Sequence, residues 1–171
     1  MMKYRFLILT FFAALLAGCK ENQWMDWKAQ NDLWLEQNIT AHQNDPNFHV
    51  LSDGLQYRII ADPNPLGPRP NESGTIVCDY TCTLINGYLL DGGTGQFSTS
   101  DVISGFWEGL RKIHEHGDIE IYVPYYLGYD KEVFTNDKIG DADGKGTEGT
   151  QSYIPPYSVL IYTIHLSSVS N

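Results

Sequence analysis

Positive charge is scarce in this 171-residue sequence: Lys and Arg total 11 against 21 Asp and Glu, which gives a formal net charge of −10. A protein that binds nucleic acid needs a basic face for the phosphate backbone, so this balance disfavours nucleic acid as a partner. The length is that of one globular domain. The 11 tyrosines and 16 glycines favour β structure over an all-helical fold.

Cysteine is scarce too, and its spacing argues against a disulfide. Apart from Cys19, the sequence has only Cys78 and Cys82, four residues apart in a predicted strand. Their Cα atoms should lie about 13 Å apart, whereas a disulfide needs less than about 7 Å. We therefore predict two free, mostly buried thiols. Because no zinc-type cysteine pair occurs and the five histidines are scattered, we expect neither a metal site nor a cofactor.

The sequence also lacks the usual motifs of covalent catalysis. It has no G-x-S-x-G turn, no cysteine placed before a histidine partner and no phosphate-cradling glycine loop. Aromatic and branched apolar residues recur instead at predicted strand ends and loop tips, beside the carboxylate of Asp91. This pattern favours a hydrophobic groove that binds an apolar segment.

The only long apolar run lies near the N-terminus and predicts an export signal. Lys3 and Arg5 precede the apolar residues 6–16, a run too short to span a bilayer but typical of a secretory signal peptide. The following Leu-Ala-Gly-Cys19 resembles a bacterial lipobox, so we predict a signal peptide over residues 1–18 and lipidation of Cys19. The expected location is the bacterial cell envelope, lipid-anchored to the outer membrane and facing the periplasm. An ordinary signal peptide is the alternative.

Residues 19–50 are predicted to form an N-terminal helical segment and a linker. Residues 21–41 contain neither Gly nor Pro, and Asn44-Asp45-Pro46 breaks the helix. One broad helical face carries Trp24, Trp27, Asn31, Trp34 or Leu35, and Asn38. The helix either docks or dimerises through this face, or packs on its own domain. We favour packing on the same domain and expect a monomer.

Residues 51–171 alternate between strand patterns and one short helix, which predicts an α+β domain. Strands are expected at residues 54–60, 76–84, 88–90, 119–123 and within 153–169, with a hairpin at Asn86-Gly87. Phe106, Leu110 and Ile113 share the apolar face of a helix that Gly117 ends. A sheet must cover that face.

Two segments read as loops. Four prolines fall within residues 61–73, which excludes that segment from a sheet interior. Residues 130–152 are polar and glycine-rich. Within them Asp141-Ala142-Asp143-Gly144 matches only part of a calcium loop, so a solvated loop is the preferred interpretation.

Five motifs in order resemble the FK506-binding-protein (FKBP) family of peptidyl-prolyl isomerases, in the version carried by bacterial envelope lipoproteins. Residues 76–81 (IVCDYT) are similar to the family's V-x-V-x-Y-T, and 86–91 (NGYLLD) to its dG-x-x-F-D. Phe97 with 102–106 (VISGF) is similar to F-x-x-x-x-V-I-x-G-W, 123–129 (VPYYLGY) to I-P-x-x-L-A-Y-G, and 154–162 (IPPYSVLIY) to I-P-P-x-x-x-L-x-F.

The resemblance implies an antiparallel sheet wrapped around one short helix, with a proline-binding pocket. Phe106 would be the pocket floor, although Trp107 is an alternative because the family has tryptophan there. The Ile103 amide and the Tyr129 hydroxyl would hold carbonyls of the bound chain, and Asp91 would border the twisted amide. The pocket lining would comprise Tyr80, Leu90, Asp91, Phe97, Val102, Ile103, Phe106, Tyr129, Ile154 and Tyr162.

The implied function is peptidyl-prolyl cis-trans isomerisation, as a folding helper that acts on proline-containing segments of exported proteins. Departures from the family pattern at Leu90, Gly92 and Asp130 support an alternative. In that alternative the same fold has weak or no isomerase activity and serves as a peptide- or partner-binding module.

Overall fold

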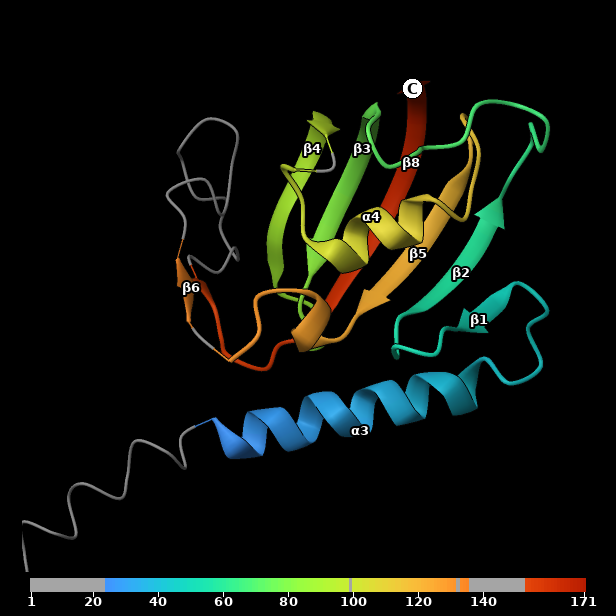
Figure 1. Ribbon diagram of the computed structural model, residues 1–171. Coiled ribbons are helices and arrows are strands. Elements are labelled where there is room, and N and C mark those ends of the chain that lie inside the picture. The colour runs from blue at the N-terminus through green and yellow to red at the C-terminus, as the bar shows by residue number, and fades with distance from the viewer. Residues whose placement is uncertain (1–23, 99, 132, 136–152) are drawn as a thin grey trace, which may run out of the picture.

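A six-stranded antiparallel sheet carries one short helix on one face, which confirms the predicted α+β architecture (Figure 1). The computed structural model describes residues 24–98, 100–131, 133–135 and 153–171. The strand order is β1-β2-β5-β8-β3-β4. The strands are β1 (Phe48–Val50), β2 (Gln56–Ala61), β3 (Thr75–Thr83), β4 (Leu89–Ser98), β5 (Asp118–Val123) and β8 (Leu160–Ser170). Outside this sheet, β6 (Phe134–Thr135) pairs with β7 (Tyr153–Ile154).

The central strand β8 follows the alternation of its sequence. Leu160, Tyr162, Ile164 and Leu166 are buried, whereas Thr163 and His165 between them are exposed. Successive side chains of a strand point to opposite faces, so the apolar set covers the face that carries the helix. β8 therefore supplies the middle of the core, between β5 and β3.

The helix on the sheet, α4 (Ser104–Leu110), is shorter than the sequence predicts. It ends at Leu110 rather than near Gly117, and Ile113 lies in the following turn, although it is fully buried like Leu110. Gly105 and Gly109 allow the close approach of α4 to β5, because a Cβ at either position would collide with Val123 or Ile121. This packing fixes the N-terminal end of α4 beside the sheet.

Three strands differ from the prediction. β4 continues from Leu89 to Ser98, although Gly92, Gly93 and Gly95 indicate a break, because every residue from Asp91 to Ser98 pairs with β3. As an edge strand it tolerates glycine without leaving a gap in the core. β1 lies in the predicted linker, and β6 lies in the predicted polar loop. Their short length explains why neither shows a clear alternation.

The two described cysteines, Cys78 and Cys82, are free and buried, as predicted. Burial raises the pKa of each thiol to about 12. Both are therefore protonated at neutral pH and are poor nucleophiles.

The N-terminal helix α3 (Met25–Ala41) packs on the same chain, which confirms the favoured interpretation (Figure 1). Trp27 Nε1 donates to Ser158 Oγ at 3.0 Å, and Asn38 Nδ2 donates to Gln56 Oε1 at 2.9 Å. The fully buried Asn31 accepts from the Val159 N–H at 2.8 Å. The predicted face of α3 thus contacts the rest of the domain through hydrogen bonds of polar side chains as well as through apolar packing.

Replacing Asn31 with Ala is expected to lower the free energy of unfolding by about 1–3 kcal/mol, because the buried Val159 N–H would lose its acceptor. Urea titration monitored by circular dichroism measures the change. Gln30→Ala, at an exposed position of the same helix, is the matched control and should change stability by less than about 0.5 kcal/mol. An equal effect of the two substitutions would contradict this role of Asn31.

Several predictions fall on residues outside the described part of the chain: the signal peptide 1–18, Cys19 and the acidic loop 136–152. The division into residues 19–50 and 51–171 stays a prediction. Among the described residues, no helix is long and apolar enough to cross a membrane. In that part of the chain no three His, Cys, Asp or Glu side chains gather where they could hold a metal ion.

Candidate active site

The structure brings all ten predicted pocket residues together around one cavity of about 790 Å³. The cavity lies between β3, β4, the start of α4 and the segments around Tyr129 and β7. Those ten are joined by Cys82, Gly92, Gly93, Thr94, Asp101 and Phe134. We call this space the aromatic cavity. That these residues bind a ligand stays a prediction.

Phe106 lines the aromatic cavity, and that it forms the floor stays a prediction. It is 3% exposed and lies near the N-terminus of α4. Its ring meets Tyr162, Phe97 and Tyr80 edge to face, with centroids 5.0, 5.9 and 6.3 Å away, the arrangement that aromatic quadrupoles favour. Trp107, the other residue considered for the floor, lines a different cavity. Phe106 and Trp107, although adjacent on α4, therefore line two different cavities.

The start of α4 presents a backbone donor to the cavity. Ile103 has an extended conformation (φ −65°, ψ 152°) and caps the helix without a side-chain hydrogen bond. Its carbonyl accepts from the Trp107 N–H at 3.3 Å, and within the described residues its own N–H makes no hydrogen bond. The Ile103 N–H is thus available to a carbonyl oxygen of a bound chain.

Asp91 places a carboxylate on the wall of the cavity. Its Oδ2 accepts a hydrogen bond from the Tyr80 hydroxyl at 2.7 Å, and its Oδ1 accepts from the Gly92 N–H at 2.8 Å. Burial and the Asp91 carboxylate raise the pKa of Tyr80 above its usual range, so this hydroxyl stays protonated and donating. The pair fixes the carboxylate on the wall of the cavity.

Tyr129 closes the opposite side. It follows the 3-10 turn η1 (Tyr125–Leu127), and its ring stacks on Phe134 with centroids 4.0 Å apart. Burial raises the pKa of Tyr129, which keeps its hydroxyl as a hydrogen-bond donor at neutral pH. Tyr162 and Cys82, which also line the cavity, influence each other's pKa.

Sequence reasoning misses six lining residues, and two physical reasons account for four of them. Gly92, Gly93 and Thr94 enter the lining because β4 continues past Leu90. Phe134 enters because β6 pairs with β7, which sets Phe134 opposite Ile154. The apolar pair Val133-Phe134 in a polar stretch is the one signal that predicts such a contact.

Asp101 and Cys82 are missed for reasons of their own. Asp101 stands at the rim, where it accepts hydrogen bonds from the Ser98 N–H at 2.9 Å and the Ser98 hydroxyl at 2.6 Å. These bonds lower the pKa of the exposed Asp101 carboxyl. Cys82 shares β3 with Tyr80, and side chains two residues apart on a strand face the same side.

The cavity suits binding and hydrogen bonding rather than covalent chemistry. The Cys82 thiol has a pKa of about 12 because it is buried, so it is not an activated nucleophile. The aromatic base can hold a compact apolar ring. Asp91, Tyr129 and Ile103 also line the cavity, and polar groups in such a pocket can orient a ligand.

Comparison with known proteins agrees with this geometry. Residues 67–167 match the family described as FKBP-type peptidyl-prolyl cis-trans isomerase. The chain is 33% identical over 147 residues to the "Outer membrane protein MIP" of Legionella longbeachae, covering 83% of this chain and 54% of that protein. It is 30% identical over 136 residues to the "Peptidyl-prolyl cis-trans isomerase Mip" of Coxiella burnetii, covering 77% of this chain and 51% of that relative. The chain thus spans about half the length of these curated relatives.

The fold has a close counterpart among solved structures. The crystal structure of FkpA from Escherichia coli matches with a TM-score of 0.70 over 99% of this chain and 73% of that one. The sequences are 24% identical in this comparison, so the likeness concerns the fold alone.

Proposed function

The chain belongs to the FKBP-type peptidyl-prolyl cis-trans isomerase family, and we propose that it catalyses cis–trans isomerisation of X–Pro peptide bonds. The aromatic cavity carries this proposal: an apolar base at Phe106 surrounded by Asp91, Tyr129 and the Ile103 N–H. The substrates would be proline-containing segments of exported or unfolded proteins. The proline ring would rest on Phe106, and neighbouring carbonyls would accept from Ile103 and Tyr129.

Such a site needs no nucleophile. Rotation about an X–Pro bond is opposed by a barrier of about 18–20 kcal/mol, largely because the twisted amide loses its resonance. An apolar cavity disfavours the planar, more charge-separated amide relative to the twisted one, and so binds the transition state more tightly than the ground state. A preference of about 4 kcal/mol gives roughly a thousandfold acceleration.

Asp91 would border the twisting amide, where its position is held by Tyr80. A fixed carboxylate costs little reorganisation during the reaction. Leu90, Phe97, Val102, Ile154 and Tyr162 would complete the apolar surroundings that keep water from the amide.

The alternative, a binding module of the same fold with weak or no isomerase activity, is less favoured. The matched family and the Coxiella burnetii relative are named for isomerase activity. The departures at Leu90, Gly92 and Asp130 leave an open cavity with its aromatic base intact. These departures therefore do not favour the binding-module alternative over the isomerase.

A refolding assay tests the proposed role as a folding helper. A denatured protein whose slow refolding phase is limited by prolyl isomerisation is refolded with and without residues 20–171 of this chain. Acceleration of the slow phase alone, at substoichiometric enzyme, supports the proposal. An unchanged slow phase in the presence of correctly folded protein would contradict it.

For the location, we propose the cell envelope, with a lipid anchor at Cys19. The basic and apolar start of the sequence and its lipobox-like end support an exported lipoprotein. One relative also carries the name "Outer membrane protein MIP".

Replacing Cys19 with Ala is expected to move the protein from the membrane fraction to the soluble fraction, because two or more acyl chains are needed for firm anchoring. Fractionation of bacteria that express each form measures the change. Cys78→Ala, which alters a buried thiol far along the chain, is the control and should stay with the membranes. Retention of the Cys19→Ala protein on membranes would refute lipidation at this residue.

A further inference from the structure

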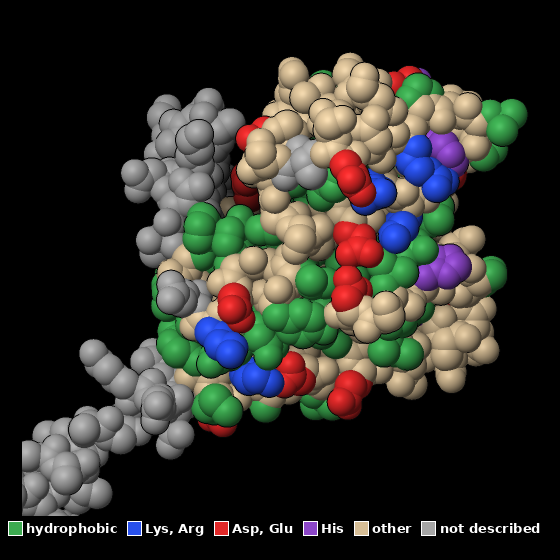
Figure 2. Space-filling model, in the orientation of Figure 1, with side chains coloured by type: hydrophobic (Ala, Val, Ile, Leu, Met, Phe, Trp, Pro, Cys, Tyr) green, Lys and Arg blue, Asp and Glu red, His purple; other side chains and the backbone are tan. Residues whose placement is uncertain are grey.

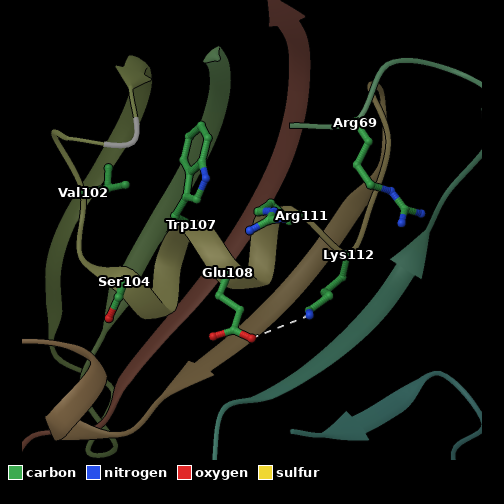
Figure 3. A pocket seen from close by; sticks show the side chains of 7 residues that line it. All are labelled: Arg69, Val102, Ser104, Trp107, Glu108, Arg111 and Lys112. Carbon is green, nitrogen blue, oxygen red and sulfur yellow. Dashed lines mark ion pairs between the residues drawn. The ribbon is translucent and has the colours of Figure 1, made fainter. Parts of the chain in front are cut away.

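A second cavity, of about 700 Å³, borders the aromatic cavity at Val102, which lines both (Figure 3). Its other walls come from α4, from the residues that follow α4 and from the loop before β3. It holds Trp107, the neighbour of the proposed pocket floor, and the basic residues Arg69, Arg111 and Lys112. We call it the cationic cavity. The proposed isomerase chemistry makes no use of it.

The cationic cavity concentrates positive charge in an acidic protein. The described part of the chain contains six Lys and Arg residues, and three of them line this one space. Figure 2 shows Lys and Arg side chains over the region of α4, with Asp and Glu side chains between them. Among the described residues, Glu108 is the one acidic residue in the lining. The space therefore carries a net positive charge, while the formal charge of the whole chain is −10.

Among the described residues, the polar contacts of these basic side chains are long. Arg111 lies 3.6 Å from Glu72, and Lys112 lies 3.7 Å from Glu108. Arg69 lies 3.5 Å from the His114 ring. Ion pairs of this length between partly exposed groups contribute little, so the cations remain able to bind a better placed anion.

Trp107 supplies an unsatisfied donor at the same place. The residue is 5% exposed, and among the described residues its Nε1 has no hydrogen-bond partner. A buried N–H without an acceptor is unfavourable and uncommon. Figure 3 shows the indole nitrogen on the side of the ring that faces Arg111. An oxygen that enters beside Arg111 would give this N–H its missing acceptor.

We propose that the cationic cavity binds an acidic side chain of the same polypeptide segment whose proline enters the aromatic cavity. The inference rests on the proposed function, which supplies the proline-containing segment as the ligand. Val102 lines both cavities, so one segment can reach from one cavity into the other. Among the described residues, the charged side chains that line the aromatic cavity are Asp91 and Asp101, which repel a carboxylate. The opposite charges of the two cavities therefore select acidic residues on one side of the proline and orient the bound chain.

Paired peptides test this selection. Each peptide contains Leu-Pro in an alanine background, with a single Glu one to four residues before or after it, and a matched Gln peptide accompanies each. Residues 20–171, labelled with nitrogen-15, are titrated while the indole N–H signal of Trp107 is followed. On one side of the proline, at least one Glu peptide should bind ~3- to 10-fold more tightly than its Gln partner and shift this signal.

Variants of the lining residues identify the cause. The double variant Arg111→Gln, Lys112→Gln should remove the Glu-over-Gln preference and leave the affinity for Gln peptides unchanged, which also shows that the variant is folded. Glu108→Gln removes the one opposing charge and should increase the preference. Equal affinities of Glu and Gln peptides at every position, or a preference that survives in the double variant, would overturn the proposal.

Failure of the isomerase proposal would look different. In that case neutral Leu-Pro peptides would neither bind nor isomerise faster. A Glu peptide in which Ala replaces Pro reports on the cationic cavity alone, because its weaker binding should still shift the Trp107 signal and still depend on Arg111 and Lys112. If this peptide leaves the Trp107 signal unmoved while neutral Leu-Pro peptides bind, the cationic cavity is not an anion site.

Discussion

Replacing Phe106 with Ala should lower the free energy of unfolding by about 3–5 kcal/mol, because a buried ring is lost from the core. Isomerase activity should fall at least about a hundredfold, because the proline ring would lose its apolar base. Both effects have one origin, the contacts of Phe106 with Tyr162, Phe97 and Tyr80. Denaturant titration and a peptide isomerase assay measure them separately.

The neighbouring residue is the control for this prediction. Trp107→Phe keeps an aromatic ring outside the aromatic cavity, and it removes one ring of the indole together with an N–H that has no partner among the described residues. It should leave activity on neutral peptides within about twofold, because it changes no group in the proline site. Phe106→Leu retains part of the side-chain volume, so its activity can be measured if Phe106→Ala does not fold. A larger loss of activity in Trp107→Phe than in Phe106→Leu would place the proline over Trp107 instead.

Replacing Asp91 with Ala should lower kcat/KM about 10- to 100-fold, since a hydrogen-bonded charged group is worth about 1.5–3 kcal/mol. Stability should change much less than in Phe106→Ala, because Asp91 is only partly buried. The reaction is followed with a Leu-Pro peptide at substrate concentrations well below KM. The substitution should lower kcat/KM, whereas the circular dichroism spectrum, which reports the secondary structure, should stay unchanged.

Two further variants separate the charge of Asp91 from its hydrogen bond. Tyr80→Phe removes the 2.7 Å hydrogen bond and keeps the carboxylate, whereas Asp91→Asn keeps an acceptor for Tyr80 and removes the charge. If the carboxylate itself borders the twisting amide, Asp91→Asn should impair activity more than Tyr80→Phe. Full activity of Asp91→Ala would show that Asp91 plays no part in isomerisation.

The sequence predicts the parts of the fold that have strong periodicity or firm chain breaks. The alternation within β8 and the run from β5 to Pro124 are as expected, because each strand buries one regular apolar face. The full length of β4 is not predicted, because its three glycines weaken the local strand pattern. Its pairing with β3 determines its conformation instead. Tertiary pairing of this kind cannot be read from a window of neighbouring residues.

The same contrast holds for the site. The ten predicted residues meet in the aromatic cavity because the family motifs carry their spacing along the chain. Phe134 and Asp101 come from short or irregular segments, so only the assembled fold brings them there. The choice between Phe106 and Trp107 also needs the structure, because adjacent residues on a helix point about 100° apart and a shift of one position exchanges their surroundings.

The most direct test of the isomerase proposal is the rate of amide rotation itself. Exchange spectroscopy resolves the cis and trans signals of a Leu-Pro peptide and measures their interconversion with and without a catalytic amount of residues 20–171. The account predicts an acceleration of the order of a thousandfold at saturating enzyme, reduced in Phe106→Leu and in Asp91→Ala. A folded wild-type protein that binds the peptide and leaves the exchange rate unchanged would contradict it and identify the chain as a binding module.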